Sequence, residues 1–364
     1  MNVNRKVCTA AAGLLAACIT AATASAQNFM EYQYGASAGA VSQVSVANLK
    51  QNWVATGVRN GEGDIELITW KSTGHALERA GSATGPAISN ASLGTVALTP
   101  HLVVTAVPTA GGGGELISWS ISASGAVTLG NTAPLPGQWL SVAKLDSRNV
   151  LVGFQDPEGT VGTFLYTVTA TAIAYENEVF NTEGTITSVA AINSGEFVTA
   201  IRTNPGTLQL DSWAVTQLGD VYHQATATAG AISAVSLTAD DEGGVATAVR
   251  NSAGDLEVIV WAVDPSSGAI ARMSSATVGA ASQVAASTIG ELIFTASVNS
   301  SGKVDAGVWG LNGSQLTAGD TAQAEAATLV AAAPLSTGLE TVTATRTAAG
   351  NLQVDVWSGD YVAP

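Results

Sequence analysis

The chain has 364 residues, of which 46% are hydrophobic and only 11% are charged, and its formal net charge is −15. This acidic balance excludes the basic surface that a partner of nucleic acids or anionic membranes needs. Both cysteines, Cys8 and Cys18, lie near the N-terminus, so packing and hydrogen bonds, not disulfides, must hold the rest of the chain together.

The first 26 residues are typical of a secretory signal peptide. Two basic residues precede an apolar, alanine-rich stretch, and Ala24-Ser25-Ala26 offers a cleavage site of small residues. We therefore expect a secreted or periplasmic protein with a single domain over residues 27–364. Without the two basic residues of the signal, 11 basic residues oppose 28 acidic ones, a net charge of −17.

A second interpretation of this segment stays open. Leu15-Ala16-Ala17-Cys18 resembles the lipobox of bacterial lipoproteins, in which Cys18 would carry a lipid anchor at the outer membrane or cell surface. No transmembrane segment is predicted, because no later segment has roughly 18 apolar residues without polar interruption.

An aromatic landmark recurs along the chain at intervals of 47 to 49 residues, and a glycine stands seven residues before each landmark. The landmarks are Trp70, Trp119, Tyr166, Trp213, Trp261, Trp309 and Trp357, and the glycines are Gly63, Gly112, Gly159, Gly206, Gly254, Gly302 and Gly350. A fixed period of this length indicates a repeat architecture.

The fifth repeat shows the predicted strands most clearly. Four short segments of small and β-branched residues, at 231–238, 245–250, 256–263 and 270–277, are separated by turn residues. Such a repeat is one four-stranded antiparallel meander. Seven of them predict an all-β fold, a seven-bladed β-propeller.

The two ends of the chain complement each other in this pattern. The last repeat ends after its third strand, whereas residues 30–40, before the first full repeat, match the fourth-strand pattern of residues 270–280. We therefore expect the N-terminal strand to complete the last blade and close the ring, which removes exposed sheet edges.

The glycines and the landmarks have mechanical interpretations. A four-residue hairpin loop commonly ends with a residue at positive φ, where glycine meets no steric penalty. The aromatic residue seven positions later lies mid-strand, where we expect it to fill the gap between blades and not to stack on a ligand.

The chain resembles seven-bladed β-propeller repeat proteins secreted by bacteria, across residues 27–364. The Trp-Asp dipeptide, kelch double glycines and Asp-box strings are absent from it, so the resemblance does not extend to a family with an assigned activity. It implies a fold and a tendency to bind ligands at one face.

Catalytic and metal-binding patterns are weak. His75, His101 and His223 fall at unrelated repeat positions, and both cysteines lie in the signal. The predicted innermost strands are neutral apart from Lys144. The acidic turn at 240–242 is interpreted as solvated, with calcium binding as the alternative. No metal and no cofactor are predicted.

A set of basic residues recurs at one repeat position. Four arginines stand eleven residues before their landmarks, namely Arg59, Arg202, Arg250 and Arg346, while Pro108, Gln155 and Val298 occupy the other three positions. An arc of arginines at one face suits carboxylate or sulfate groups. The alternative is structural: cross-strand pairs with Asp64 and Asp255.

Two further residues are predicted at the same face. Trp139 and Glu183 lie in loops that enter inner strands. The leading hypothesis is an exported, monomeric, non-enzymatic propeller that binds a glycan or a surface protein through this face. One rival is a hydrolase or lyase of extracellular polymers that uses Glu183, Arg202 and Trp139, and another is a purely structural surface protein.

Overall fold

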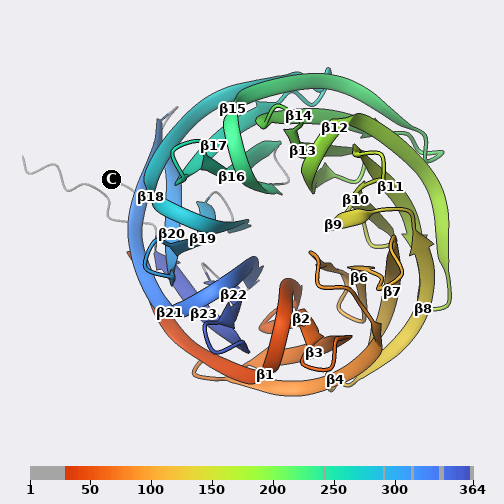
Figure 1. Ribbon diagram of the computed structural model, residues 1–364, viewed down its shortest axis with the longest axis vertical. Coiled ribbons are helices and arrows are strands. Elements are labelled where there is room, and N and C mark those ends of the chain that lie inside the picture. Colours follow the sequence, from red (N-terminus) through yellow and green to blue (C-terminus); the bar gives the residue numbers. More distant parts are fainter. Residues whose placement is uncertain (1–28, 241–242, 290–291, 313–314, 336–339, 361–364) are drawn as a thin grey trace, which may run out of the picture.

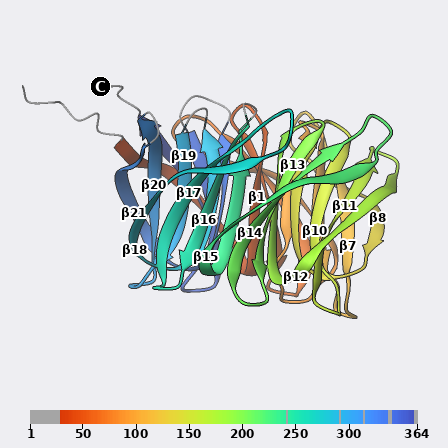
Figure 2. The same cartoon turned by 90° about the horizontal axis from the view of Figure 1, so that it is seen from above.

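The computed structural model describes residues 29–240, 243–289, 292–312, 315–335 and 340–360. All regular elements of these residues are β-strands, which stand in antiparallel groups around a central axis (Figure 1, Figure 2). This is an all-β, propeller-like fold. The expected signal peptide lies outside the described residues. Within them, no helix could cross a membrane.

Each group of strands contains one aromatic landmark, after which we name it. The Trp70 unit contains residues 41–50 of β1 (Phe29–Lys50), β2 (Trp53–Asn60), β3 (Asp64–Ser72) and β4 (Leu77–Ala87). The Trp119 unit contains β5 (Gly94–Thr99), β6 (Leu102–Pro108), β7 (Gly114–Ile121) and β8 (Val127–Leu135). The Tyr166 unit contains β9 (Gln138–Lys144), β10 (Asn149–Gln155), β11 (Thr160–Val168) and residues 173–183 of β12 (Ile173–Asn193).

The remaining units follow the same order. The Trp213 unit contains the rest of β12, β13 (Glu196–Thr203), β14 (Thr207–Val215) and residues 221–231 of β15 (Val221–Ala239). The Trp261 unit contains the rest of β15, β16 (Gly244–Asn251), β17 (Asp255–Val263) and residues 270–280 of β18 (Ile270–Ile289). The Trp309 unit contains the rest of β18, β19 (Leu292–Asn299), β20 (Lys303–Asn312) and residues 315–326 of β21 (Gln315–Leu335). The Trp357 unit contains the rest of β21, β22 (Glu340–Thr347), β23 (Asn351–Asp360) and residues 29–40 of β1.

Several strands serve two units, which corrects the sequence prediction of separate outer and inner strands. β15, for example, is the outermost strand of the Trp213 unit and continues as the innermost strand of the Trp261 unit. Its pairing shifts register near the crossing, where residues 227–233 carry the chain from one unit to the next. Between β8 and β9 the chain instead contains Pro136, which has no N–H for a ladder, and the two strands stay separate.

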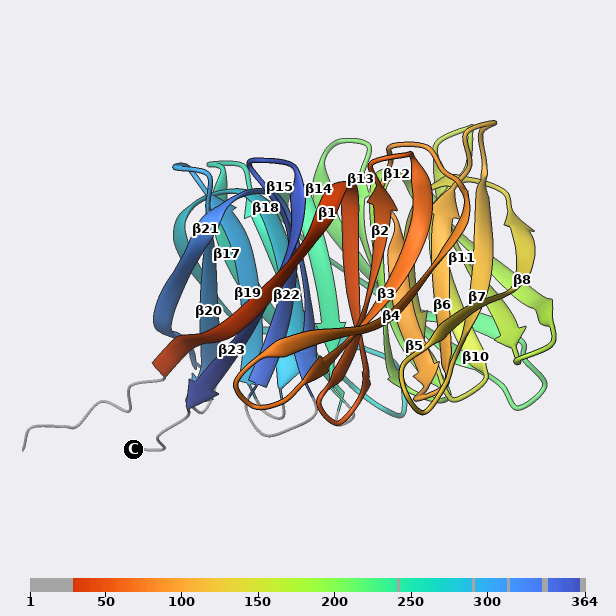
Figure 3. The ribbon, with the colours of Figure 1, turned by 90° about the horizontal axis from the view of Figure 1, so that it is seen from below.

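β1 brings the two ends of the described chain together. Its residues 29–40 pair antiparallel with β23, and its residues 41–50 pair with β2. Figure 3 shows the N-terminal part of β1 crossing beside β23. The segment predicted to act as a fourth strand is thus paired with the last strand of the chain.

The core lies between neighbouring units. β6 is buried along its whole length, whereas the outer part of β15, and β4 after its buried first residue Leu77, consist of exposed and half-buried residues. Trp119 shares a cluster of buried side chains with Ile65 and Leu67 of the preceding unit. In the same way, Trp70 shares a cluster with Val354 and Val356 of the Trp357 unit.

The landmarks are core residues, as predicted. Each is at most 4% exposed, and burial of such a ring contributes about 2–3 kcal/mol to folding. Six of them are tryptophans whose indole Nε1–H donates to the hydroxyl of a buried threonine fourteen residues earlier, at 2.8–3.1 Å. These threonines are Thr56, Thr105, Thr199, Thr247, Thr295 and Thr343.

The Tyr166 unit departs from this pattern in both partners at once. Val152 occupies the threonine position, and the Tyr166 hydroxyl donates to the Pro134 carbonyl at 3.4 Å. A tyrosine has no ring N–H, so the unit that lacks the donor also lacks the acceptor. No buried polar group is left without its partner by this exchange.

The turn glycines adopt the predicted backbone conformation. All seven have a φ between 77° and 96°. In several units the glycine carbonyl also accepts a hydrogen bond from the backbone N–H that opens the next inner strand, as Ile232 to Gly206 and Ala281 to Gly254. Val41 N–H donates to the Gly350 carbonyl at 2.8 Å in the same way.

We predict that Thr247→Val leaves the indole N–H of Trp261 buried without an acceptor. The free energy of unfolding should fall by about 1–3 kcal/mol, measured by urea denaturation. The matched control is Val152→Thr, which adds a hydroxyl where Tyr166 offers no N–H and should not stabilise the protein. An equal stability of Thr247→Val and the wild type would contradict the structural role of this bond.

Candidate functional site

The four recurring arginines make the same two contacts in each unit. Arg250 Nε donates to the Ala281 carbonyl at 2.6 Å and Nη1 donates to Ser233 Oγ at 2.8 Å. Arg59, Arg202 and Arg346 make the equivalent pairs of bonds at 2.7–2.9 Å. Each arginine therefore ties the start of its own inner strand to the start of the next unit's inner strand.

The last arginine makes this link across the chain ends. Arg346 Nε donates to the carbonyl of Val41 at 2.8 Å, although the two residues are 305 positions apart. In the Tyr166 unit, Gln155 stands at the arginine position and its side-chain amide donates to the Gly184 carbonyl. An amide can thus replace a guanidinium where only one carbonyl has to be reached.

The structural alternative, cross-strand pairs of the arginines with Asp64 and Asp255, was wrong. Arg59 and Arg250 pair with Ile65 and Leu256, one position further than the expected aspartates. Among the described residues, no ion pair involves any of the four arginines. The guanidinium instead lies over the turn glycine: a Cβ added to Gly63 would come within 2.9 Å of Arg59 Nη2. The turn favours glycine because of its positive φ, since the end of the flexible Arg59 side chain could move aside for a Cβ.

The other predicted site residues are less closely associated. Glu183 is exposed, and its carboxylate accepts a hydrogen bond from Asn204 at 2.6 Å. It forms no ion pair with Arg202 within the part of the chain that the structure describes. Trp139 belongs to β9, but its side chain lies outside the described part of the structure.

A cavity of about 520 Å³ lies among the innermost strands. Serine, alanine and valine residues line it, and Arg250 is its one ionisable lining residue among those described. Two lining hydroxyls, Ser141 Oγ and Thr187 Oγ1, are buried and have no hydrogen-bond partner in the described residues. We call this space the central cavity.

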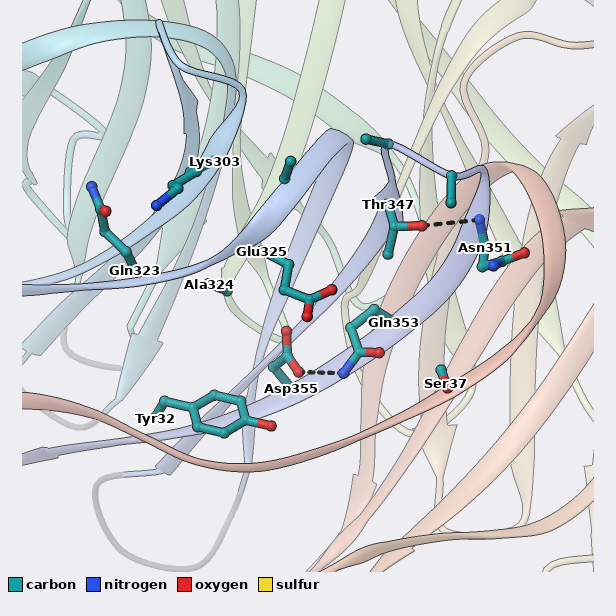
Figure 4. A pocket seen from close by; sticks show the side chains of 13 residues that line it. Tyr32, Ser37, Lys303, Gln323, Ala324, Glu325, Thr347, Asn351, Gln353 and Asp355 are labelled. Carbon is teal, nitrogen blue, oxygen red and sulfur yellow. Dashed lines mark hydrogen bonds between the residues drawn. The ribbon is translucent and has the colours of Figure 1, made fainter.

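A larger cavity of about 930 Å³ lies beside the outer parts of β1 and β21, and the sequence analysis missed it. Tyr32 of β1, Glu325 of β21 and Asp355 of β23 line it, together with several side-chain amides (Figure 4). We call it the rim cavity. Its chemistry differs from that of the central cavity, because it combines carboxylates, amides and an exposed tyrosine ring.

Asp355 is the most unusual residue of the rim cavity. It is 3% exposed, and Gln353 Nε2 donates to its Oδ1 at 2.7 Å. Burial raises the pKa of Asp355 from 3.8 to about 6, the Gln353 bond opposes this, and the nearby charge of Glu325 adds to it. Burial and the charge of Asp355 also raise the pKa of Tyr32.

Histidines and acidic groups do not gather into a metal site within the described residues. His101 lies at 2.9 Å from the Ile121 carbonyl, and His223 lies at 3.5 Å from Asp211. The candidate calcium turn includes Asp241 and Glu242, which lie outside the described residues.

We predict that Arg346→Met destabilises the protein by about 1–3 kcal/mol, because the Val41 carbonyl and Thr328 hydroxyl lose their donor. Arg346→Gln should cost clearly less, since Gln155 makes the equivalent bond in its own unit. Urea denaturation measures both changes. Arg79→Met is the control: Arg79 is exposed and pairs with Glu66 at 2.6 Å, a contact worth at most about 1 kcal/mol.

We predict that Asp355 makes stability depend on pH. The folded state binds the Asp355 proton more tightly than the unfolded state, so this contribution favours folding below about pH 4 and is lost as pH rises to about 6. Asp355→Asn, which carries no charge, should therefore exceed the wild type in unfolding free energy by up to about 3 kcal/mol at pH 7.5 and by less at pH 4. A difference between the two proteins that does not change with pH would contradict the assignment.

Comparisons with known proteins place the fold and leave the family open. No protein-family model matches the chain, and no curated protein matches it. Among solved structures, the periplasmic gluconolactonase PpgL of Pseudomonas aeruginosa aligns with a TM-score of 0.58 at 15% identity over 77% of this chain and 84% of that one. The β-propeller domain of Cps50 (Swd1) from Myceliophteria thermophila gives 0.60 at 11% identity over 90% and 99%. The C-terminal WD40 domain of Sif2 gives 0.53 at 14% identity over 90% and 98%. At these identities the likeness shows the fold alone, and that fold is a β-propeller.

Proposed function

We propose that the units form a seven-bladed ring closed by the N-terminal strand, as in secreted bacterial propellers. Three contacts of the chain ends support closure. β1 pairs with β23, Trp70 shares a cluster of buried side chains with Val354 and Val356, and Val41 accepts from Arg346 and donates to Gly350. The shared core and the hydrogen bonds of Val41 are of the kind that consecutive units make elsewhere in the chain.

We propose further that the protein is an exported, non-enzymatic binding module that recognises a glycan through the arginine face. This face is the end of the ring that carries the turn glycines, the four arginines and the entrance of the central cavity. The observation that carries the proposal is the lining of that cavity by serine residues and by Arg250. Serine hydroxyls can both donate hydrogen bonds to sugar hydroxyls and accept them, and a guanidinium can donate to sugar oxygens.

The proposed site residues have graded roles. Arg250 lines the central cavity directly, and its Nη2 is not needed for the two bonds that hold the inner strands. Arg59, Arg202 and Arg346 present the same atom at the face. Glu183 and Trp139 complete the rim of the entrance in this proposal, Glu183 as an acceptor and Trp139 as a stacking surface for a sugar ring.

A glycan array with the purified protein tests this proposal. The wild type should bind at least one glycan, and Arg250→Ala and Trp139→Ala should each weaken binding about tenfold or more. Arg79→Ala, which changes an exposed arginine of the outer strand β4, is the control and should bind normally. Absence of glycan binding, or full binding by both face variants, would refute the proposal.

A further inference from the structure

Two units share a sequence pattern that the other units lack. Gln209-Leu210-Asp211-Ser212-Trp213 and Gln353-Val354-Asp355-Val356-Trp357 both place a glutamine four residues and an aspartate two residues before the landmark. Both aspartates are buried, at 2% and 3% exposure. The same carboxylate is therefore present at the same place in two units, and its surroundings can be compared.

In the Trp213 unit the protein itself surrounds the carboxylate. Asp211 Oδ2 accepts from Asn181 at 2.8 Å and from Gln209 at 2.9 Å. Asp211 Oδ1 accepts from the Thr226 hydroxyl at 2.5 Å, and His223 Nε2 lies 3.5 Å from it. Two amides and a hydroxyl thus donate to this buried carboxylate, as its burial requires.

In the Trp357 unit three of these four groups are replaced. Thr226 is the strand partner of Asp211, and the equivalent partner of Asp355 is Gly35. His223 is the strand partner of Trp213, and the equivalent partner of Trp357 is Tyr32.

The third replacement is at the preceding unit's outer strand. Asp305 and Gly162 each stand four positions before the landmark of their unit. The residue paired with Asp305 is followed by Ala324, and the residue paired with Gly162 is followed by Asn181. Ala324 and Asn181 therefore occupy equivalent positions. The hydroxyl, the imidazole and one amide that surround Asp211 are therefore absent around Asp355, and only the glutamine is present in both units.

The removed side chains leave the rim cavity beside an incompletely coordinated carboxylate. No described residue donates a hydrogen bond to Asp355 Oδ2. Figure 4 shows Glu325 and Asp355 directed toward each other, with Gln353 alongside and Tyr32 below. Tyr32 is 46% exposed, and its ring packs edge-to-face on Trp357 with centroids 5.6 Å apart, which holds it in place as a wall.

We propose that the rim cavity binds a neutral, polyhydroxylated ligand, a sugar, whose hydroxyl groups replace around Asp355 the Thr226 hydroxyl and Asn181 amide that surround Asp211. Sugar hydroxyls can donate to Asp355 and Glu325 and accept from the amides of Gln353, Gln323 and Asn351. Lys303 also lines the cavity, which makes a small cation a poorer match for the two carboxylates. The site is separate from the central cavity and does not depend on the function proposed for it.

The test uses a glycan array of neutral glycans, followed by calorimetric titration of the best glycan into the purified protein at pH 7.5. Asp355→Asn should weaken binding about tenfold or more, since it removes the charged acceptor. Ala324→Asn should do the same, because it returns to Asp355 the amide that Asn181 gives Asp211 and fills the cavity from within. Glu66→Gln, which changes a partly buried acid of β3 that pairs with Arg79, is the control and should bind as the wild type does.

The outcomes separate this proposal from the previous one and from cation binding. Loss of binding in Asp355→Asn and Ala324→Asn, with Arg250→Ala and Trp139→Ala unaffected, supports the rim cavity. Loss of binding in Arg250→Ala and Trp139→Ala alone overturns it. A lack of binding to any neutral glycan also overturns it. If calcium chloride binds the wild type but not Asp355→Asn, and no sugar binds, the site is a cation site and the proposal is overturned. Thermal melting of each variant excludes misfolding, since Asp355→Asn should melt no lower than the wild type.

Discussion

The hydrogen bond from a landmark indole to a threonine hydroxyl is the interaction on which the rest of the structure depends. It joins the third strand of a unit to the second and fixes the orientation of the indole side chain between two units. Each ring then packs against the preceding unit, so one polar contact inside a unit determines the apolar contact between units. The Tyr166 unit exchanges both partners together, which is what a buried donor and acceptor demand.

A second layer of contacts connects one unit to the next at the arginine face. Arg202 and Arg250 direct their charge at backbone carbonyls, and the glycine below each guanidinium allows this close approach. Interpreting such arginines as an anion-binding arc from their spacing is natural, because spacing does not reveal what each N–H contacts. In the folded chain Nε and Nη1 of each arginine donate to the protein, and Nη2 is not needed for these two bonds.

Repetition determines what could be predicted from the sequence. The positive φ of Gly254, the burial of Trp261 and the strand character of residues 30–40 all follow from features that recur in each repeat. The threonine acceptors also recur, fourteen residues before each tryptophan, and could have been found by the same comparison. The rim cavity could not, because it lies where one repeat departs from another. Gly35 and Ala324 are inconspicuous in the sequence and become informative only beside Thr226 and Asn181 in the folded units.

Strands such as β15 and β18, which belong to two units without a loop between them, constrain how the gene could change in length. A residue inserted or deleted within such a strand would move the following side chains of that strand to the opposite face of the sheet. Solvent-facing groups would then point inward in one of the two units. The hairpin turns tolerate such changes far better. This constraint is consistent with the narrow spacing of 47 to 49 residues between landmarks.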